Sequence, residues 1–407
     1  MDCKKIIVQW QEFQIPEVLP REIRIDMDHD FITTVTGPRR AGKTYLCFQK
    51  VRSLLKEGVR KGNVLYINFE DEKLLGADAE DLDMLLDTFY ELSDMDGNQK
   101  IYLFLDELQN VKNWDVWVRR IYDMDKNLKI VLTGSSSKML SREISTKLRG
   151  RILNIEVFPL SFTEFLGWKK VPHGSREISH SKERFGIKKA FSSYLSGGGY
   201  PSLLVNENVP KETILQGYLQ SMIFKDIVER YGIKDVKKLQ ILAKLLFEST
   251  SREISYSRLA NRMKSLGFSM SKNTVIEFIS HFEDAYLFFQ NLKYDYSLAK
   301  QLGSIKKIYC IDNGLLNAVS FKFSDDAGKL AENLVFIELK RRHADVFYHR
   351  NKHECDFLIR EKDRVTGAIQ VTTQLNEENY KREVKGLIEA MDTHGLKDGI
   401  IITDDME

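Results

Sequence analysis

The sequence is poor in the features that mark secreted, membrane-spanning or disordered proteins. Its 407 residues include only seven prolines, no low-complexity segment and no apolar run near the ~20 residues that span a bilayer. The four cysteines are isolated and share no C-x-x-C spacing, which argues against a disulfide framework or a zinc site; they are Cys3, Cys47, Cys310 and Cys355. The first residues lack the apolar core of a signal peptide. We therefore expect a cytoplasmic protein without a membrane segment.

An excess of charge of one sign is missing as well. The 61 Lys and Arg residues nearly balance the 59 Asp and Glu residues, which leaves a net charge of +2. No overall basic field therefore indicates nucleic acid, and any such surface must be local. With 43% hydrophobic and 29% charged residues, the chain has the composition of a globular protein, and it is long enough for two or three domains.

The most specific pattern that is present is a glycine-rich loop, G-x-x-x-x-G-K-[ST], between the strand-like run 31–36 and a helix-forming run. With the aromatic residue after it, the loop consists of Gly37, Pro38, Arg39, Arg40, Ala41, Gly42, Lys43, Thr44 and Tyr45. In a strand–loop–helix context, backbone N–H groups and the helix N-terminus converge on phosphates. We expect Lys43 to reach the β- and γ-phosphates of ATP and the Thr44 hydroxyl to ligate Mg²⁺.

A pair of acids follows a second strand-like run. The runs 63–69, 101–107 and 129–134 alternate with helical segments, which predicts a parallel P-loop sheet with helices on both faces. The middle run ends in Asp106 and Glu107, a Walker B pattern. Asp106 would hold the Mg²⁺ shell, and Glu107 would orient and deprotonate the attacking water. The alternative for this pair is a solvated helix cap.

Two further polar groups are weaker candidates for the same chemistry. The cluster 133–137 ends the next strand, and we take Ser135 as a sensor hydroxyl for the γ-phosphate or the water; the alternative is a serine-rich turn and helix N-cap. Arg149 and Arg151 are candidates for an arginine finger, although exposed arginines are usually only solvated. A finger from a neighbouring subunit would require an oligomer.

Together these motifs resemble a family of prokaryotic AAA+-like P-loop ATPases that carry a C-terminal domain of unknown function. The resemblance continues at four landmarks, 158–165, 198–201, 225–231 and 309–315, and covers the chain from about residue 20 to its end. It implies an AAA+-like ATPase domain over 1–170 and a helical lid or connector over 171–235.

The segment 236–312 has the helix and strand order of a winged helix-turn-helix domain. Its basic residues outnumber Glu253, the single acid between 252 and 272; they are Arg252, Arg258, Arg262, Lys264 and Lys272. The region 252–277 could therefore contact DNA phosphates and a major groove. The alternative is a packing or protein-partner module, as winged helices of ATPases often are.

The last part, 313–407, has the layout of the PD-(D/E)xK nucleases, an α/β restriction-endonuclease-like fold. Glu332 on a helix and Asp356 on a strand match that layout, but Gln370 stands in place of the second acid and Thr372 in place of the lysine. Because both changes weaken Mg²⁺ binding and nucleophile activation, we do not expect cleavage. A migrated lysine, Lys340 or Lys352, could restore it, and a sheet–helix domain with incidental acids is the plain alternative.

The sequence thus predicts an ATP-hydrolysing molecular switch whose C-terminal domains engage a partner, either an unknown protein or DNA through 252–277 and the C-terminal domain. The alternative function is an ATP-regulated DNA-binding protein or a nuclease.

Overall fold

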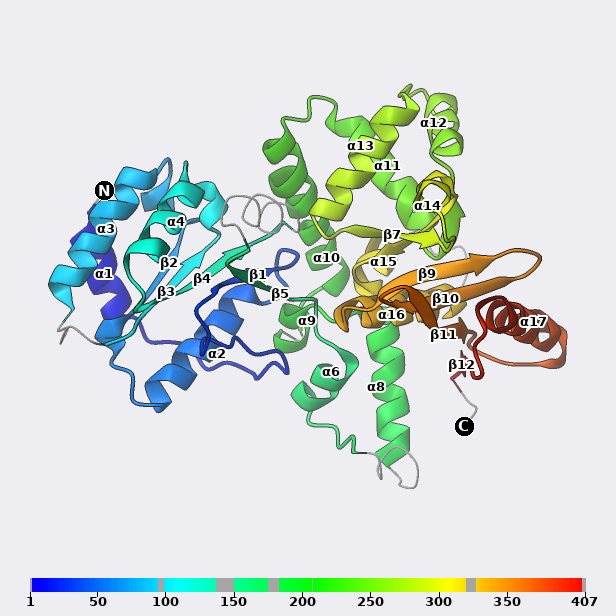
Figure 1. The fold of residues 1–407 in the computed structure, drawn as a ribbon, viewed down its shortest axis with the longest axis horizontal. Coiled ribbons are helices and arrows are strands. Elements are labelled where there is room, and N and C mark those ends of the chain that lie inside the picture. Colours follow the sequence, from blue (N-terminus) through cyan, green and yellow to red (C-terminus); the bar gives the residue numbers. More distant parts are fainter. Residues whose placement is uncertain are drawn as a thin grey trace. The chain divides into compact units, whose positions relative to one another are not determined.

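The computed structural model describes residues 2–93, 99–136, 150–174, 183–206, 208–319 and 327–404. The chain forms two compact units, residues 1–158 and 159–407 (Figure 1). The predicted division of the second unit into connector, winged-helix and nuclease-like parts stays a prediction. None of the helices in the described ranges is both long and apolar enough to cross a membrane.

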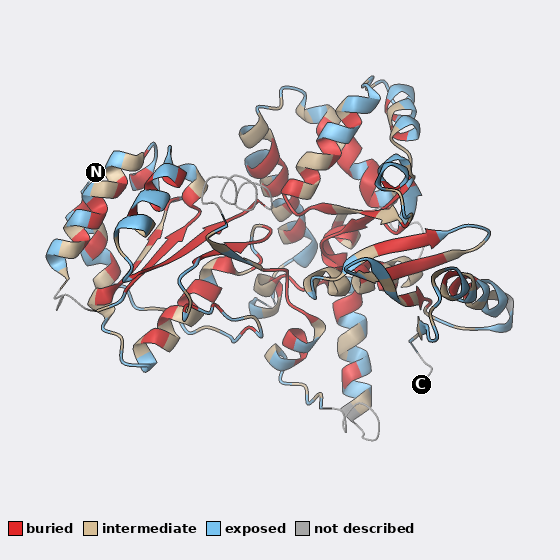
Figure 2. Ribbon diagram, in the orientation of Figure 1, coloured by how far each residue is buried: buried red, intermediate tan, exposed pale blue. Residues whose placement is uncertain are grey.

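The first unit is built on a five-stranded parallel sheet in the order β2–β3–β4–β1–β5. Four strands agree with the predicted ones: β1 Ile32–Thr36, β2 Val64–Asn68, β3 Ile101–Asp106 and β4 Leu128–Gly134. The fifth, β5 Ile152–Glu156, was not predicted. Every residue of β1, β3 and β4 is buried (Figure 2). Their continuous apolar runs therefore reflect central strands that are covered on both faces.

Helices connect these strands and complete the core of the first unit. They are α1 Cys3–Glu12, α2 Lys43–Lys56, α3 Ala79–Leu92 and α4 Trp114–Met124. In Figure 1, α2 lies on one side of the sheet and α4 on the other. This is the outcome of right-handed crossovers, because the chain runs from β1 outward to β2 and then back through β3 to β4. The carboxyl ends of β1, β3 and β4 consequently meet at one edge.

The glycine-rich loop is fixed by a backbone approach that a side chain would prevent. Gly37 has φ +151°, and a Cβ on it would lie 2.1 Å from the carbonyl oxygen of Val157. The Val157 N–H in turn donates to the Thr36 carbonyl at 2.7 Å. The segment that follows β5 therefore lies against the start of the loop.

The second unit consists mainly of helices before residue 250 and of a sheet after it. The helices are α6 Phe162–Trp168, α8 Glu183–Gly197, α9 Pro201–Val205, α10 Lys211–Ser221, the π-helix Met222–Glu229, α11 Val236–Glu248, α12 Tyr256–Ser265, α13 Lys272–Asp284, α14 Leu298–Gly303, α15 Asn313–Val319, α16 Ala327–Arg341 and α17 Glu377–His394. The strands are β6 Arg252–Ile254, β7 Phe288–Lys293, β8 Lys306–Cys310, β9 Asp345–Arg350, β10 Glu354–Glu361, β11 Arg364–Val371 and β12 Ile400–Ile402.

One seven-stranded sheet joins the predicted winged-helix and nuclease-like parts. Its order is β12–β11–β10–β9–β7–β8–β6, and the parallel pair β7–β9 connects the strands before residue 312 to those after it. The predicted order of helices and strands in 236–312 is present, with β6 added before α12 and α14 added between β7 and β8. The two predicted parts therefore share hydrogen-bonded backbone across their proposed boundary.

The landmarks of the second unit meet in its interior. The Gly199 N–H donates to Asp312 Oδ2 at 2.7 Å, and the Asn333 amide bonds both the N–H and the carbonyl of Cys310. In the landmark 158–165, Ser161 and Glu164 form a capping box at the start of α6. These sequence signals thus serve the fold, because each satisfies buried backbone groups.

The close contact of Gly37 predicts a position-specific loss of stability. Gly37→Ala should lower the free energy of unfolding by about 2 kcal/mol or more, since it combines a positive φ with a backbone clash. Gly58→Ala is the matched control: its φ is +92°, but nothing lies within 4 Å of the added Cβ, so about 1 kcal/mol is expected. Urea unfolding checks both, and equal losses would contradict the role of the Val157 contact.

Candidate functional site

The predicted ATP-site residues come together at the carboxyl edge of the first sheet. Gly42 has φ +99° and caps α2, so Lys43 and Thr44 lie in the first helical turn. Asp106 ends β3, and Glu107 follows it. Thr44 Oγ1 donates to Asp106 Oδ2 at 2.7 Å. These two side chains supply neighbouring hard oxygen donors, which is the chemistry that suits Mg²⁺.

Lys43 links the phosphate-binding loop to the candidate base. Its side chain is 5% exposed, and Nζ donates to the carbonyl oxygens of Gly37 at 3.1 Å and Pro38 at 3.2 Å. The same Nζ lies 3.3 Å from Glu107 Oε1. Lys43, the predicted phosphate ligand, and Glu107, the predicted base, are therefore in direct contact.

Glu107 is held in a strained and specific position. Its φ is +54°, which an L-residue adopts only when its surroundings enforce it. Gln109 Nε2 donates to Glu107 Oε2 at 2.5 Å. Burial alone would raise the pKa of Glu107, but the Lys43 ammonium and the Gln109 amide outweigh it and lower that pKa. Glu107 is therefore ionised at neutral pH, as a base must be.

The pKa of Asp106 is shifted in the opposite direction, upward. Burial and the adjacent Glu107 charge raise its pKa, against hydrogen bonds from Thr133, Tyr66 and Thr44 that lower it. Tyr66 OH donates to Asp106 Oδ2 at 2.7 Å. A buried carboxylate whose charge is only partly compensated favours a nearby cation. The residues present thus fit Mg²⁺, with Asp106 and Thr44 as its protein ligands.

The hydroxyl that joins the two acids is Thr133 rather than the predicted Ser135. Thr133 Oγ1 donates to Asp106 Oδ1 and accepts from the Glu107 N–H at 3.0 Å. Ser135 is buried two residues further on, and its sensor role stays a prediction. Thr133 belongs to the same polar cluster, but strand alternation would place positions 133 and 135 on the same face, so the pattern alone does not separate the two.

The structure places Arg151 away from the nucleotide loop of its own chain. It precedes β5, whose first residue pairs with Ile32 at the start of β1, whereas the loop follows the end of β1. Five strand residues separate the two edges by roughly 15 Å. Arg151 is paired with Asp123 there. Arg151 is thus not a finger for its own site, and a role toward another subunit stays a prediction; Arg149 lies outside the described residues.

The structure also describes Arg39 and Tyr45, two further positions of the glycine-rich loop. Arg39 Nη1 forms a 2.5 Å ion pair with Glu70 Oε1, and Tyr45 is 53% exposed on α2. Sequence reasoning missed Arg21, which is 7% exposed. Its Nη1 donates to the Ala41 carbonyl inside the loop at 2.9 Å and its Nη2 to the Phe158 carbonyl at 3.0 Å.

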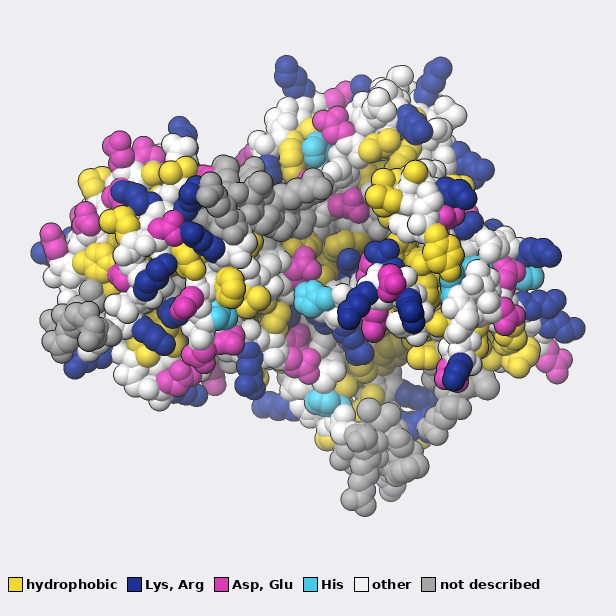
Figure 3. Space-filling model, in the orientation of Figure 1, with side chains coloured by type: hydrophobic (Ala, Val, Ile, Leu, Met, Phe, Trp, Pro, Cys, Tyr) yellow, Lys and Arg dark blue, Asp and Glu magenta, His cyan; other side chains and the backbone are white. Residues whose placement is uncertain are grey.

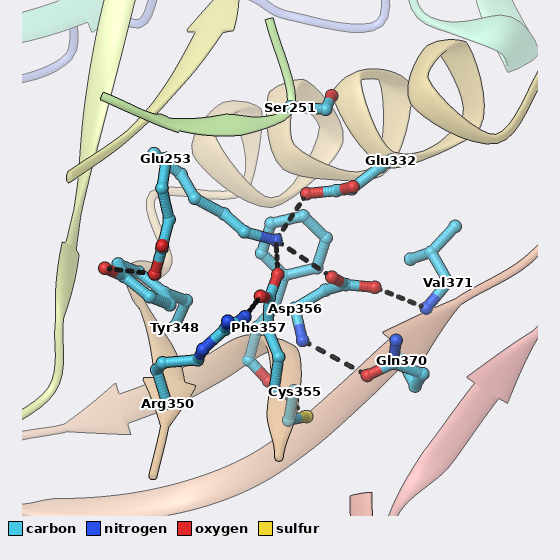
Figure 4. A network of polar contacts seen from close by, with 12 residues as sticks. Ser251, Glu253, Glu332, Tyr348, Arg350, Cys355, Asp356, Phe357, Gln370 and Val371 are labelled. Carbon is cyan, nitrogen blue, oxygen red and sulfur yellow. Dashed lines mark hydrogen bonds and ion pairs between the residues drawn. The ribbon is translucent and has the colours of Figure 1, made fainter. Parts of the chain in front are cut away.

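A second charged cluster lies in the C-terminal unit. Glu332 of α16, Asp356 of β10 and Gln370 of β11 point toward one another, as the nuclease-like layout predicts (Figure 4). The unpredicted member is Lys307 of β8, whose side chain is 2% exposed. Its Nζ lies 2.9 Å from Glu332 Oε1, 2.6 Å from Glu354 Oε1 and 3.0 Å from Asp356 Oδ1.

Lys307 corrects the expectation about the lysine. Neither Lys340 nor Lys352 forms these contacts: Lys340 lies two turns beyond Glu332 on α16, and Lys352 is exposed. A lysine inside a fully buried strand was the available signal, since lysine is almost never buried unless it is paired. Burial alone would lower the pKa of Lys307, but Tyr309, Asp356 and the other acids raise it well above its usual value.

Comparisons with known proteins agree with the two-part organisation. Residues 29–166 match the AAA domain, and residues 188–326 match a domain of unknown function, DUF8612. An uncharacterized protein of Methanocaldococcus jannaschii is 37% identical over 92% of this chain and 82% of its own length. An uncharacterized protein of Haemophilus influenzae is 33% identical over 88% of this chain and 86% of its own.

Among solved structures, the chain is similar to the Walker-type ATPase PABY2304 of Pyrococcus abyssi. The two share 16% sequence identity, with a TM-score of 0.46. The likeness covers 75% of this chain and 99% of that one.

The raised pKa of Asp106 predicts a pH-dependent affinity for Mg²⁺–nucleotide. Because only the carboxylate binds the cation, affinity should fall as Asp106 takes up a proton, and this should begin at a higher pH than for an exposed Asp. Titration calorimetry with Mg²⁺–ADP should show a loss of about tenfold from about pH 8 to pH 5. Asp106→Asn is the control, because this variant removes the titration of Asp106 and keeps that of the nucleotide. An identical pH profile of affinity in the variant would contradict the assignment of Asp106 as a Mg²⁺ ligand.

The position of Thr133 predicts that it matters more for turnover than Ser135 does. Thr133→Val keeps the shape but removes the acceptor of the buried Glu107 N–H, which costs about 1–3 kcal/mol. We expect kcat for ATP hydrolysis to fall by about tenfold or more, and by less in Ser135→Ala. A larger loss in Ser135→Ala would return the sensor role to Ser135.

Proposed function

The chain belongs to the same family as the uncharacterized M. jannaschii and H. influenzae proteins, its N-terminal unit carries an AAA domain, and we propose that it is an ATP-hydrolysing molecular switch. The observation that carries this proposal is the single cluster of Lys43, Thr44, Asp106 and Glu107 at one sheet edge. Bound Mg²⁺–ATP supplies the phosphoanhydride bond that is broken.

Each residue of that cluster has a separate task. Lys43 and the loop N–H groups hold the phosphates, and Thr44 and Asp106 hold the cation. Glu107 orients a water and accepts its proton on a carboxylate oxygen, which its lowered pKa and fixed backbone support. Thr133 keeps both acids in register by bonding one side chain and the other backbone.

Arg21 supports the switch part of the proposal. It bonds the Ala41 carbonyl in the nucleotide loop and the Phe158 carbonyl at the last residue of the first unit. Gly37 touches Val157 in the same exit segment. A shift of the loop on nucleotide exchange would therefore pull directly on the segment that leads into the second unit, with Arg21 as a positioning residue.

The second unit would carry the output. Its order α11–β6–α12–α13–β7–α14–β8, with β6 and β7 each antiparallel to β8, supports the winged-helix interpretation of 236–312. The face seen in Figure 3 mixes Lys and Arg with Asp and Glu, so the proposed DNA contact is local to 252–277. A protein partner is the alternative to DNA. An arginine finger supplied by a neighbouring subunit would require an oligomer.

Glu107→Gln tests the mechanism. It should leave Mg²⁺–ATP affinity within a few fold while lowering kcat by roughly 10²–10⁴, the usual contribution of a general base. Binding calorimetry and a phosphate-release assay measure the two quantities. Glu57→Gln, an exposed glutamate at the end of α2, is the matched control and should hydrolyse ATP at the wild-type rate. Undiminished hydrolysis by Glu107→Gln would refute the proposal.

A further inference from the structure

An open pocket of about 750 Å³ surrounds the charged cluster of the C-terminal unit. Its charges are sorted by depth. The acids Glu332, Asp356 and Glu383 are buried or nearly so, whereas four basic side chains in the lining are exposed: Arg252, Arg350, Lys352 and Arg382. The pocket therefore has acids at its base and cations at its mouth.

Most oxygens of these acids are engaged by other groups of the described chain. Asp356 uses Oδ1 for Lys307 and Oδ2 for the Val371 N–H at 3.0 Å. Glu354 uses Oε1 for Lys307 and Oε2 for Arg350. Glu332 Oε1 accepts from Lys307 and from Tyr309 OH at 2.7 Å. The Lys307 ammonium thus contacts three carboxylates at one point, and Arg350 supplies a second cation to one of them, Glu354.

Gln370 is engaged in the same way. Its Oε1 accepts from the Asp356 N–H at 3.2 Å, and its Nε2 donates to Glu383 Oε2 at 2.6 Å. The one neutral oxygen that could replace the second acid is therefore used to hold Asp356 in place. The amide thereby links β10, β11 and α17, the elements that carry Asp356, Gln370 and Glu383.

Cations nevertheless outnumber acids at this pocket, because Lys307 and five lining cations (Arg252, Lys329, Arg350, Lys352 and Arg382) face four lining acids (Glu332, Glu354, Asp356 and Glu383). At the mouth, Arg350 is paired with Glu354 and Arg382 with Glu383. Ala327 and Gly328, the first residues of the 15-residue helix α16, also line the pocket, and a helix N-terminus adds positive potential. Arginine side chains at such a mouth match phosphate oxygens in geometry and charge.

We propose that this pocket binds the phosphodiester backbone of single-stranded nucleic acid without a divalent cation, because Lys307 occupies the place between the acids that a cation would take. A flexible single strand can bend into a concave pocket, whereas a stiff duplex cannot. The described lining has Arg and Lys and no Phe, Tyr or Trp, with His353 as its one imidazole, so we expect contacts to the backbone without sequence preference. This inference is independent of the ATPase proposal.

Fluorescence anisotropy with a labelled oligothymidine of about 12 nucleotides tests the proposal on the full chain, in EDTA. Wild-type protein should bind, with affinity that falls with salt. Arg350→Gln/Arg382→Gln should weaken binding at least about tenfold and reduce the salt slope by roughly one to two. Arg360→Gln, an arginine paired with Asp345 outside the pocket, is the matched control and should bind like wild type. Binding at the nucleotide loop would survive the double substitution.

Lys307→Met supplies a second, opposite signature. Removal of the ammonium frees three carboxylates, so binding in EDTA should fall at least about tenfold and return on addition of Mg²⁺. Circular dichroism confirms folding, and the arginine variants decide the question if this variant does not fold. The proposal is overturned if wild-type binding needs Mg²⁺, or if the double variant binds like Arg360→Gln. It is also overturned if thymidine monophosphate competes as well as the oligonucleotide at equal phosphate concentration, or if the oligonucleotide is cleaved.

Discussion

A buried charge must be paired, and in each unit of this protein a buried lysine meets that requirement by contacting carboxylates. Lys43 contacts Glu107 and two loop carbonyls, and Lys307 contacts Glu332, Glu354 and Asp356. The cost of an unpaired charge in these interiors is several kcal/mol, so the geometry around each lysine is strongly constrained. Glu107, which contacts Lys43, has a left-handed backbone conformation that is unfavourable for an L-residue.

The two lysines lead to different chemistry because their surroundings differ. Lys43 lies in the first turn of α2, and it contacts the carbonyls of a glycine-rich loop whose pattern is that of a phosphate-binding loop. Lys307 lies inside a sheet strand. The second oxygens of Glu354 and Asp356 are occupied by Arg350 and the Val371 N–H, and Tyr309 donates to the same Glu332 oxygen that Lys307 contacts. The first arrangement suits exchange of a ligand, whereas the second suits a permanent internal ion cluster.

Much of the first unit could be predicted because its signals are local. The run 37–44 specifies its own loop, and the strand that ends in Asp106 specifies where the acids lie, so the site follows once the sheet is parallel. The landmarks 198–201 and 309–315 of the second unit could be recognised in the sequence, but their structural role could not. Gly199 and Asp312 are separated by 113 residues, and only folding shows that one donates to the other.

The sequence by itself determined the nucleotide loop and the acids of β3, because each depends on a short pattern within one element. Glu332, Asp356 and Gln370 lie on three different elements, α16, β10 and β11, and the fold brings them to one region. Only the tertiary structure decided which lysine joins those acids. Lys307 is 25 residues from Glu332 and 49 from Asp356, and it reaches them because β8 enters the same sheet as β10. Strand order is set by the packing of the whole sheet, and no local pattern encodes it.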